Sequence, residues 1–277
     1  QPRAPAPRPD PPPDPPPDPP PDPRSDQRPG LRTAARSAPT VSVRCFGGFR
    51  LELAGQTVDL TPVRARARSA LRLLGTHAGQ VVHKEVLIEA LWPGLPVAAA
   101  TRNLQVTVSA LRGLLEPSSE RGKAQLLIRS GDAYGIALPE GSFSDTATFT
   151  AAVSRWKQTH RTGTSAERAD TLRAVLAAYP APLLPEEGPA DWAVNARERF
   201  QREVIGAART LAMVELDQGN LPEAVTTAEY CLSLDPHDDE AWRVLIRAYT
   251  GGGALAKAIE VRRRYAEMLA SLGLPEL

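Results

Sequence analysis

Residues 97–115, VAAATRNLQVTVSALRGLL, decide the fold, because apolar residues recur in them with the period of an α-helix. Leu104, Val108, Leu111 and Leu115 fall at positions i, i+4, i+7 and i+11, which aligns them in one stripe. The stretch therefore predicts one amphipathic helix whose apolar stripe packs on a hydrophobic core.

The opposite face of this predicted helix is suited to contact a partner. A helix face that only meets water is commonly filled with Glu and Lys in i, i+4 pairs, whereas this stretch has no acidic residue. At about 100° per residue, the face carries Arg102, Gln105, Val106, Ser109, Ala110 and Gly113, with Asn103 and Arg112 on its flanks.

These residue types favour a helix that enters the DNA major groove. Arg bonds guanine bidentately, Asn and Gln bond adenine, Ser bonds either kind of base, and a small apolar side chain meets the thymine methyl. An ordinary surface helix that contacts another protein is the competing interpretation, and the helix alone does not decide between the two. The candidates for base readout are Arg102, Asn103, Gln105, Val106 and Ser109.

The segments before this helix predict a sheet and two further helices. Three short alternating runs separated by glycine predict a small antiparallel sheet over residues 41–60. A helix is expected from Pro62 to about His77, because Pro is tolerated in the first turn of a helix and Gly79 follows its end. Residues 84–91 predict a second, short helix, so the stretch at 97–115 is the third.

The segment after this helix predicts a hairpin with its turn at Gly131-Asp132. The order of sheet, three helices and hairpin is that of a winged helix-turn-helix, in which the third helix enters the major groove and the hairpin reaches the backbone or minor groove. This order favours DNA, and the alternative that remains is a winged helix that binds protein. The arginines at the ends and flanks of the motif, expected to contact the DNA backbone, are Arg64, Arg66, Arg112 and Arg129.

Charge is distributed unevenly along the 277 residues, whose net charge is only +1. Residues 1–40 have six Arg against five Asp, residues 41–138 have twelve Lys and Arg against seven acids, and residues 139–277 have fifteen against twenty, which gives +1, +5 and −5. A basic middle segment beside an acidic one indicates that the middle segment meets a polyanion.

Cysteine content and hydropathy indicate the compartment. Cys45 and Cys231 are far apart and match no metal spacing, so both are interpreted as buried thiols of a reducing compartment. There is no run of 18 apolar residues and no apolar core of a signal peptide. We expect a soluble, cytoplasmic protein that makes no membrane contact.

The first forty residues predict a disordered, proline-rich tether. Residues 1–40 hold sixteen of the 28 prolines, arranged around the repeat PPPD, which favours an extended and solvated chain. A ligand for a proline-recognising domain is the alternative to a spacer. Because the sequence starts with Gln1, it is compatible with a fragment of a longer protein.

The last part of the chain predicts a helical repeat. Gly219 and Gly253 lie 34 residues apart, and Trp242, Leu245 and Tyr249 follow the first-helix pattern of a tetratricopeptide unit. Such helix pairs stack into a surface that binds a peptide or another subunit, although Trp242 and Tyr249, like Tyr265, are interpreted as filling the stack. The helices are expected at residues 145–160, 165–179, 191–218, 221–234, 238–250 and 254–271.

No catalytic motif is present in the sequence. It lacks GxxxxGK[ST], GxSxG and HExxH, so neither an enzyme nor a bound cofactor or metal is expected. A protein-interaction adaptor that works through its helical repeats is the competing class of function. The histidines are scattered and are interpreted as surface or helix-capping residues: His77, His83, His160 and His237.

Several motifs together resemble the Streptomyces antibiotic regulatory protein (SARP) family, whose members join an OmpR-type winged helix to a bacterial transcriptional activator domain. The resemblance covers the chain except the tether, and it places a winged helix-turn-helix at 41–139 and a tetratricopeptide-like, all-α activator domain at 145–277. The residues that carry it are CFGGFRLEL at 45–53, EVLIEALWP at 85–93, TRNLQVTVSALRGLLEP at 101–117, IRSGDAYGIAL at 128–138 and AYPAPLLPEE at 178–187 with Asp191-Trp192.

The resemblance implies a cytoplasmic transcription activator that binds direct repeats in double-stranded DNA near promoters and contacts RNA polymerase holoenzyme. Pairing of two copies on such a repeat is expected, because a single winged helix makes few contacts. Ala110 and Gly113 stand where the family often has Arg, and His83 where it often has a capping Ser or Thr, which implies weaker binding or an unusual target. The output portion of a larger sensing regulator is a further alternative.

Overall fold

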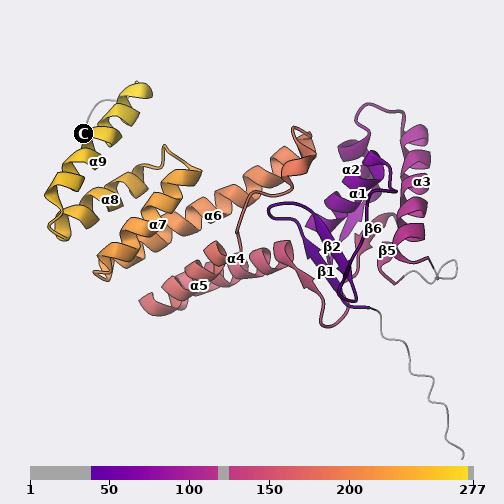
Figure 1. Cartoon of the computed structure of the whole chain (residues 1–277), viewed down its shortest axis with the longest axis horizontal. Helices are drawn as coiled ribbons and strands as arrows, with labels where there is room; N and C mark the ends of the chain where they lie inside the picture. The colour runs from indigo at the N-terminus through magenta and orange to yellow at the C-terminus, as the bar shows by residue number, and fades with distance from the viewer. Residues whose placement is uncertain (1–38, 118–124, 274–277) are drawn as a thin grey trace, which may run out of the picture. The chain divides into compact units, whose positions relative to one another are not determined.

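The computed structural model describes residues 39–117 and 125–273, without the side chains of residues 160 and 161. The tether expected over residues 1–40 therefore lies outside the described part of the chain, apart from its last two residues. Within the described ranges, none of the helices combines the length and hydropathy needed to cross a bilayer. Figure 1 shows the order of the elements along the chain.

The first sheet contains the three expected strands and one more. β1 (Val41–Arg44), β2 (Arg50–Leu53) and β3 (Gln56–Thr57) are antiparallel neighbours. β7 (Phe143–Ser144) pairs in parallel with the other edge of β1, so the strand order is β3-β2-β1-β7. The fourth strand was not predicted, because a two-residue strand is too short to show an alternating pattern.

The three helices and the hairpin of a winged helix follow as expected. The hairpin pairs with a short strand before the second helix to form a three-stranded sheet of order β4-β6-β5. Gly135 is required in this sheet, because a Cβ there would lie 2.3 Å from the Gln80 carbonyl oxygen. The elements are α1 (Ala65–Thr76), β4 (Val81–His83), α2 (Lys84–Leu91), α3 (Val97–Leu115), β5 (Leu127–Ser130) and β6 (Ala133–Ile136).

The rest of the chain is helical, and each helix packs against the next one. A short 3₁₀ turn, η1 (Pro185–Glu187), stands between the second and third of these helices. The predicted bounds agree with the structure to within two residues. The helices are α4 (Asp145–Thr162), α5 (Ser165–Ala177), α6 (Asp191–Asp217), α7 (Leu221–Leu234), α8 (Asp239–Gly251) and α9 (Leu255–Ser271).

The 34-residue sequence repeat is also a structural repeat. Gly219 and Gly253 both adopt left-handed backbone angles, with φ of 78° and 75°. In each case the next N–H group donates to the carbonyl oxygen four residues before the glycine, at 2.9 Å, which ends the helix in the same way. Trp242 and Tyr265 are buried and their rings stack at 6.0 Å between centroids, which confirms that they fill the helix stack. The predicted fold class is confirmed.

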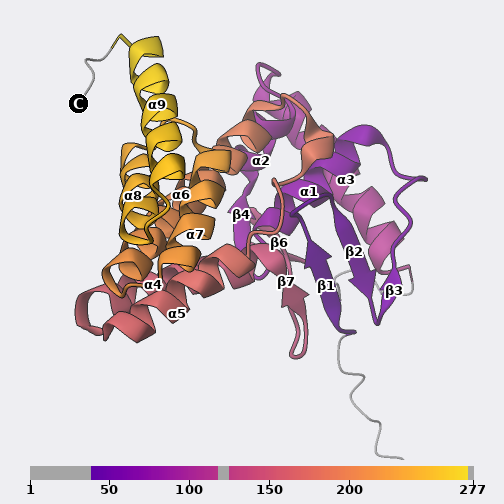
Figure 2. The same ribbon diagram turned by 60° about the vertical axis from the view of Figure 1, so that its left-hand side comes forward.

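One hydrophobic core extends from the winged helix into the first helices of the helical part. Phe46 follows β1, Phe149 lies on α4, Tyr179 follows α5 and Phe200 lies on α6, and neighbouring ring centroids in this cluster are 5.1–5.9 Å apart. A second core joins α6 to α9. The division expected near residue 140 thus marks a change of secondary structure, and hydrophobic packing continues across it. Figure 2 shows α4 to α6 beside the winged helix from a second side.

A carboxylate also joins the winged helix to the helical part, through hydrogen bonds to the loop after β1. Asp145, the first residue of α4, accepts hydrogen bonds through Oδ2 from the N–H groups of Cys45 at 2.7 Å and Phe46 at 2.9 Å. Burial raises the pKa of Asp145, against the opposing effect of these donors. These bonds satisfy backbone donors of the loop after β1.

An ion-pair latch joins α1 to the segment before α6. Arg72 of α1 donates to Glu187 at 2.7 Å and lies 3.3 Å from Glu186. The Ser69 hydroxyl donates to Glu187 at 2.9 Å, and Glu186 accepts from the Phe49 N–H at 2.7 Å. The first helix of the winged helix is therefore tied to the helical part by charge as well as by packing.

We expect Asp145→Ala to lower the free energy of unfolding by about 2–4 kcal/mol, because it leaves two backbone N–H groups without an acceptor. Asp145→Asn keeps one acceptor oxygen and should cost clearly less. Urea denaturation followed by circular dichroism measures both. Glu140→Ala, at a nearby exposed position, is the control, and an Asp145→Ala protein as stable as that control would contradict the role assigned to this carboxylate.

Candidate nucleic-acid interface

The two faces of α3 are arranged as the sequence predicted. The stripe of Leu104, Val108, Leu111 and Leu115 is buried on the core side. Val106, on the opposite face, is 66% exposed, so its side chain is open to a partner. The other predicted base-reading residues are also exposed: Arg102, Asn103, Gln105 and Ser109.

The start of α1 brings two arginines next to this face. Arg64 and Arg66 line one groove, of about 700 Å³, together with Asn103 and Val106 of α3 and with Trp92. Both arginines are exposed, and among the described residues neither takes part in an ion pair. Residues predicted separately for base and backbone contacts thus share one surface, on which positive charge is available to phosphates.

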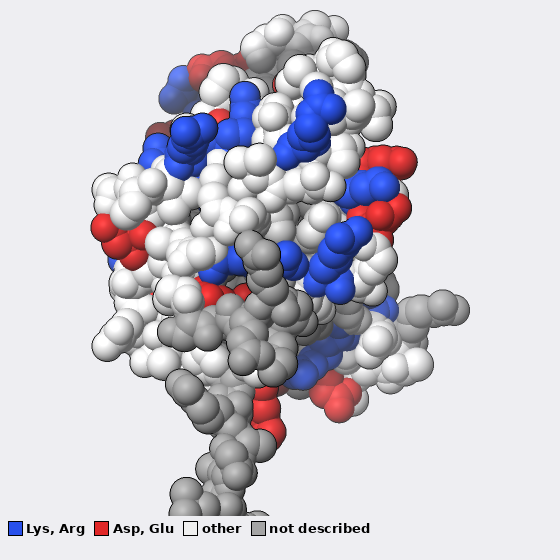
Figure 3. Space-filling view, turned by 90° about the vertical axis from the view of Figure 1, so that its right-hand side faces the viewer, with Lys and Arg blue, Asp and Glu red and all other residues white. Residues whose placement is uncertain are grey.

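Figure 3 views the side of the molecule on which α3 lies in Figure 1. Lys and Arg side chains are spread over this face between uncharged surface, and the acidic side chains lie mostly toward its edges. The uncharged surface agrees with the absence of acidic residues from α3. Such a distribution suits a surface that approaches a polyanion.

Arg129 lies on the wing and is partly engaged by the wing itself. Its Nε donates to the Gly131 carbonyl at 2.8 Å, and its guanidinium lies 5.8 Å from the centroid of the Tyr134 ring. The next residue in the turn, Asp132, accepts from Lys84 at 2.7 Å, and this contact lowers the pKa of Asp132. The wing tip is thereby fixed to the start of α2, with the Arg129 side chain 56% exposed.

Arg112 is placed differently from the other predicted backbone contacts. It is half-buried, and its guanidinium donates to the Leu127 carbonyl of β5 at 3.4 Å. Nearby, Glu116 accepts from the N–H groups of Gln125 and Leu126 at 2.5 and 2.6 Å. The end of α3 is therefore braced against the wing by these side chains, and for Arg112 a phosphate contact stays a prediction.

Two features of the surface were not foreseen. Trp92 lines the groove beside α3, and its position at the end of α2 did not show which way the ring points. Val97, at the first turn of α3, is 74% exposed, which the apolar pattern of the helix did not predict. Trp92 therefore extends the apolar part of the surface near the predicted base-reading residues.

His83 and the two cysteines occupy structural positions. His83 stands at the N-cap of α2, where its Nδ1 accepts from the Glu85 N–H at 3.4 Å, so it does occupy a capping position. Cys45 and Cys231 are both buried, as predicted, and this burial raises the pKa of both thiols, that of Cys231 to about 12. Among the residues with described placement, no group of His, Cys, Asp or Glu is arranged to hold a metal ion.

Comparison with known families matches both halves of the chain. The family model "Transcriptional regulatory protein, C terminal" matches residues 55–132, and the family model "Bacterial transcriptional activator domain" matches residues 144–275. The first range contains α1 to α3 and β5, and it ends in the turn of the hairpin before β6, whereas the second begins at β7 and contains the helical part.

Individual relatives are distant. The transcriptional regulatory protein MoaR1 of Mycobacterium tuberculosis is 22% identical over 236 residues, which is 85% of this chain and 75% of that protein. MoaR1 of Mycobacterium bovis is 22% identical over 240 residues with the same coverage. The solved structure of Mycobacterium tuberculosis EmbR in complex with a low-affinity phosphopeptide has a TM-score of 0.69 at 21% identity. It matches 86% of this chain, which spans only 62% of the EmbR chain.

The fold and the exposed face of α3, together with the matched families, define a winged-helix transcription regulator. The order of an OmpR-type winged helix followed by a bacterial transcriptional activator domain is the architecture of the SARP family, and the chain belongs to that family.

If Arg102 reads a base edge, Arg102→Ala should weaken binding to the selected target by about 1–3 kcal/mol and relax the preference at one or two positions. Binding to random duplex should change much less. Selection of a target from a random pool, followed by fluorescence anisotropy on target and random duplexes, measures both. An equal loss on the two duplexes would contradict base readout.

Arg64→Gln and Arg66→Gln should each weaken binding to all sequences alike. Each should also reduce the slope of log K against log salt by about 0.9, because one phosphate contact is lost. Arg155→Gln, on the exposed surface of α4, is the matched control and should keep the slope. An unchanged slope in both groove variants would contradict the phosphate contacts and show that these arginines are only solvated surface residues.

Proposed function

We propose that the protein is a sequence-specific transcription activator that binds direct repeats in double-stranded DNA near promoters and contacts RNA polymerase holoenzyme in the cytoplasm. The observation that carries the proposal is the acid-free, exposed face of α3 beside the groove that Arg64 and Arg66 line. The matched families supply the coarser statement, a regulator of transcription.

In the proposed complex, α3 lies in the major groove with Arg102, Gln105 and Ser109 toward base edges. The apolar Val106 meets a thymine methyl, and the arginines of α1 meet phosphates on one side of the groove. The wing, fixed to α2 by Lys84, reaches the backbone beside it. This assignment is supported by the exposure of the side chains and by the short distance in the fold between α1 and α3.

We further propose that two copies bind side by side on one target. The predicted contacts of a single winged helix are few, and a second copy on the same duplex adds effective concentration. Direct repeats require both copies to face the same way along the DNA, which places their half-sites on the same side of the helix.

The helical part is proposed as the surface that meets the polymerase. Residues 139–277 have a net charge of −5, so this half is not suited to the DNA backbone. Its stacked helices α6 to α9 resemble repeats whose common role is to bind another protein. No catalytic step is part of the proposal.

Footprinting on a selected target should show half-sites that recur at one helical turn, about 10–11 bp apart. Run-off transcription from a promoter with that target should rise when the complete chain and polymerase holoenzyme are both present. Arg102→Ala should lose footprint and activation together. A footprint over one isolated half-site would contradict the proposed pairing of two copies. A footprint without any rise in transcript would contradict the proposed role in activation.

A further inference from the structure

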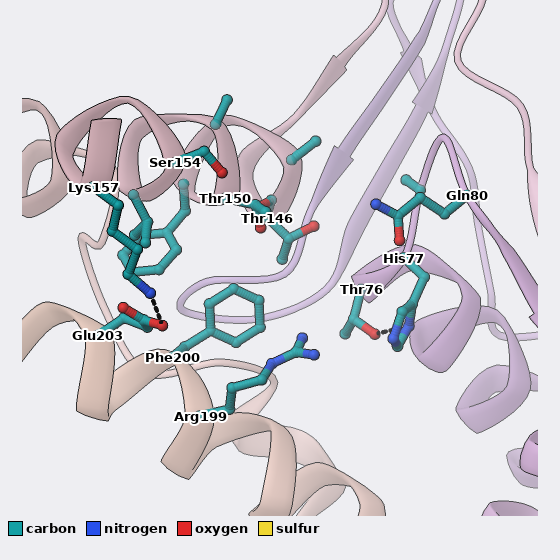
Figure 4. A pocket seen from close by; sticks show the side chains of 15 residues that line it. Thr76, His77, Gln80, Thr146, Thr150, Ser154, Lys157, Arg199, Phe200 and Glu203 are labelled. Carbon is teal, nitrogen blue, oxygen red and sulfur yellow. Dashed lines mark hydrogen bonds and ion pairs between the residues drawn. The ribbon is translucent and has the colours of Figure 1, made fainter. Parts of the chain in front are cut away.

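A cleft of about 500 Å³ lies where the winged helix meets the helical part (Figure 4). The end of α1 and the turn that follows it, residues 76–78 and 80, line one side. Side chains of α4 and α6 line the other side. The cleft is therefore shared by the two halves of the protein, and it is separate from the surface beside α3.

The floor of this cleft is apolar and rigid. Phe149, Val153 and Phe200 form it, and all three are buried. The rings of Phe149 and Phe200 meet edge to face at 5.3 Å between centroids, and Phe46 supports both of them from behind at 5.9 and 5.4 Å. An apolar wall that is already packed in this way does not have to be rearranged to receive a ligand.

One cation of the cleft, the exposed Arg199 on α6, is left without an ion pair among the residues that the structure describes. Arg199 reaches from α6 toward Thr76 and His77 on the opposite side (Figure 4), and its guanidinium lies 5.0 Å from the centroid of the Phe200 ring. In the described part of the chain it forms no ion pair with a carboxylate. Lys157, the other cation of the cleft, is neutralised by Glu203 at 2.7 Å. A guanidinium that rests on a ring keeps its N–H edge free for a planar acid group.

Polar groups on the α1 side complete the lining. His77 Nδ1 lies 3.1 Å from the Leu73 carbonyl oxygen and 2.8 Å from the Thr76 hydroxyl, so Nδ1 is engaged within the protein, and Nε2 has no hydrogen-bond partner among the described residues. The side chains of Gln80 and Ser154 also border the cleft without a hydrogen bond to any residue that the structure describes. A ligand can therefore find hydrogen-bond partners on both sides.

We propose that this cleft binds a small molecule that has a flat apolar body and one acidic group. The body packs along Ala147, Thr150 and Ala151, which are exposed lining residues of α4 beside the buried rings, and the acid pairs with Arg199. The volume is within the range of small-molecule pockets, about 300–1,000 Å³. Because residues of α1 on one side and of α4 and α6 on the other line the same cleft, a bound ligand contacts both halves at once.

The test uses two fluorescent probes of matched shape. 8-Anilinonaphthalene-1-sulfonate has an aromatic body and one anion, and N-phenyl-1-naphthylamine has the same body without charge. Fluorescence titration and calorimetry with the complete chain should give one saturable site for the anionic probe. Arg199→Gln should raise the Kd of the anionic probe about tenfold through loss of a charged hydrogen bond, and leave that of the neutral probe within about twofold. Arg202→Gln, on the same helix but outside the cleft, should leave both unchanged.

A second pair of variants locates the site without removing charge. Ala151→Trp fills the cleft from an exposed position on α4 and should abolish binding of both probes, whereas Ala174→Trp on the exposed face of α5 should not. Thermal unfolding checks that both proteins fold, and Ser154→Trp is the alternative filling variant. Absence of saturable binding would overturn the proposal. So would an anionic-probe Kd unchanged in Arg199→Gln, or retention of both probes in the filled cleft.

Discussion

The carboxylate of Asp145 is the interaction on which the junction of the two halves depends. It stands at the first residue of α4, and it accepts the backbone N–H groups of Cys45 and Phe46, so the loop after β1 is satisfied only when α4 begins at this place. The Phe46 side chain then enters the ring cluster with Phe149 and Phe200. Polar and apolar contacts therefore fix the same loop, and both need residues that follow the winged helix in the sequence.

This junction bears on the proposed DNA contacts through α1. The first turns of that helix present Arg66 to the groove beside α3, and a position further along presents Arg72 to Glu187 before α6. One helix therefore carries both the arginine proposed to face DNA and the arginine that pairs with the helical part. The cleft proposed to bind a ligand lies at the end of the same helix. A ligand there would change the position of α1 relative to the helical part only if it bound one relative position of the two more tightly than another.

Local sequence patterns were sufficient to predict most helices and strands. Contacts between residues far apart in the sequence could not be predicted from these patterns. The helix at 97–115 was predicted with its correct bounds and faces, because a 3.6-residue period reports burial directly. β7 was missed, because its pairing with β1 depends on residues about a hundred positions away. Arg112 shows the same limit within the candidate site: its spacing placed it on a flank of α3, but its bond to Leu127 follows from the path of the hairpin. The cleft beside Arg199 depends on three separate helices and left no signal in the sequence.

The proposed base-reading residues all lie before the boundary near residue 140, but some of the contacts that stabilise the winged helix come from residues after it. A chain that ended there would keep every residue proposed to read bases, yet it would lose β7 and the acceptor for two backbone N–H groups. These N–H groups would then bond water, so each lost hydrogen bond costs about 0.5–1.5 kcal/mol, and Phe46 would lose the rings against which it packs. Against a total stability of about 5–15 kcal/mol for a typical domain, these losses are large. The winged helix buries a core of its own, and the contacts across the junction add to its stability. The same contacts join the helical half to α1.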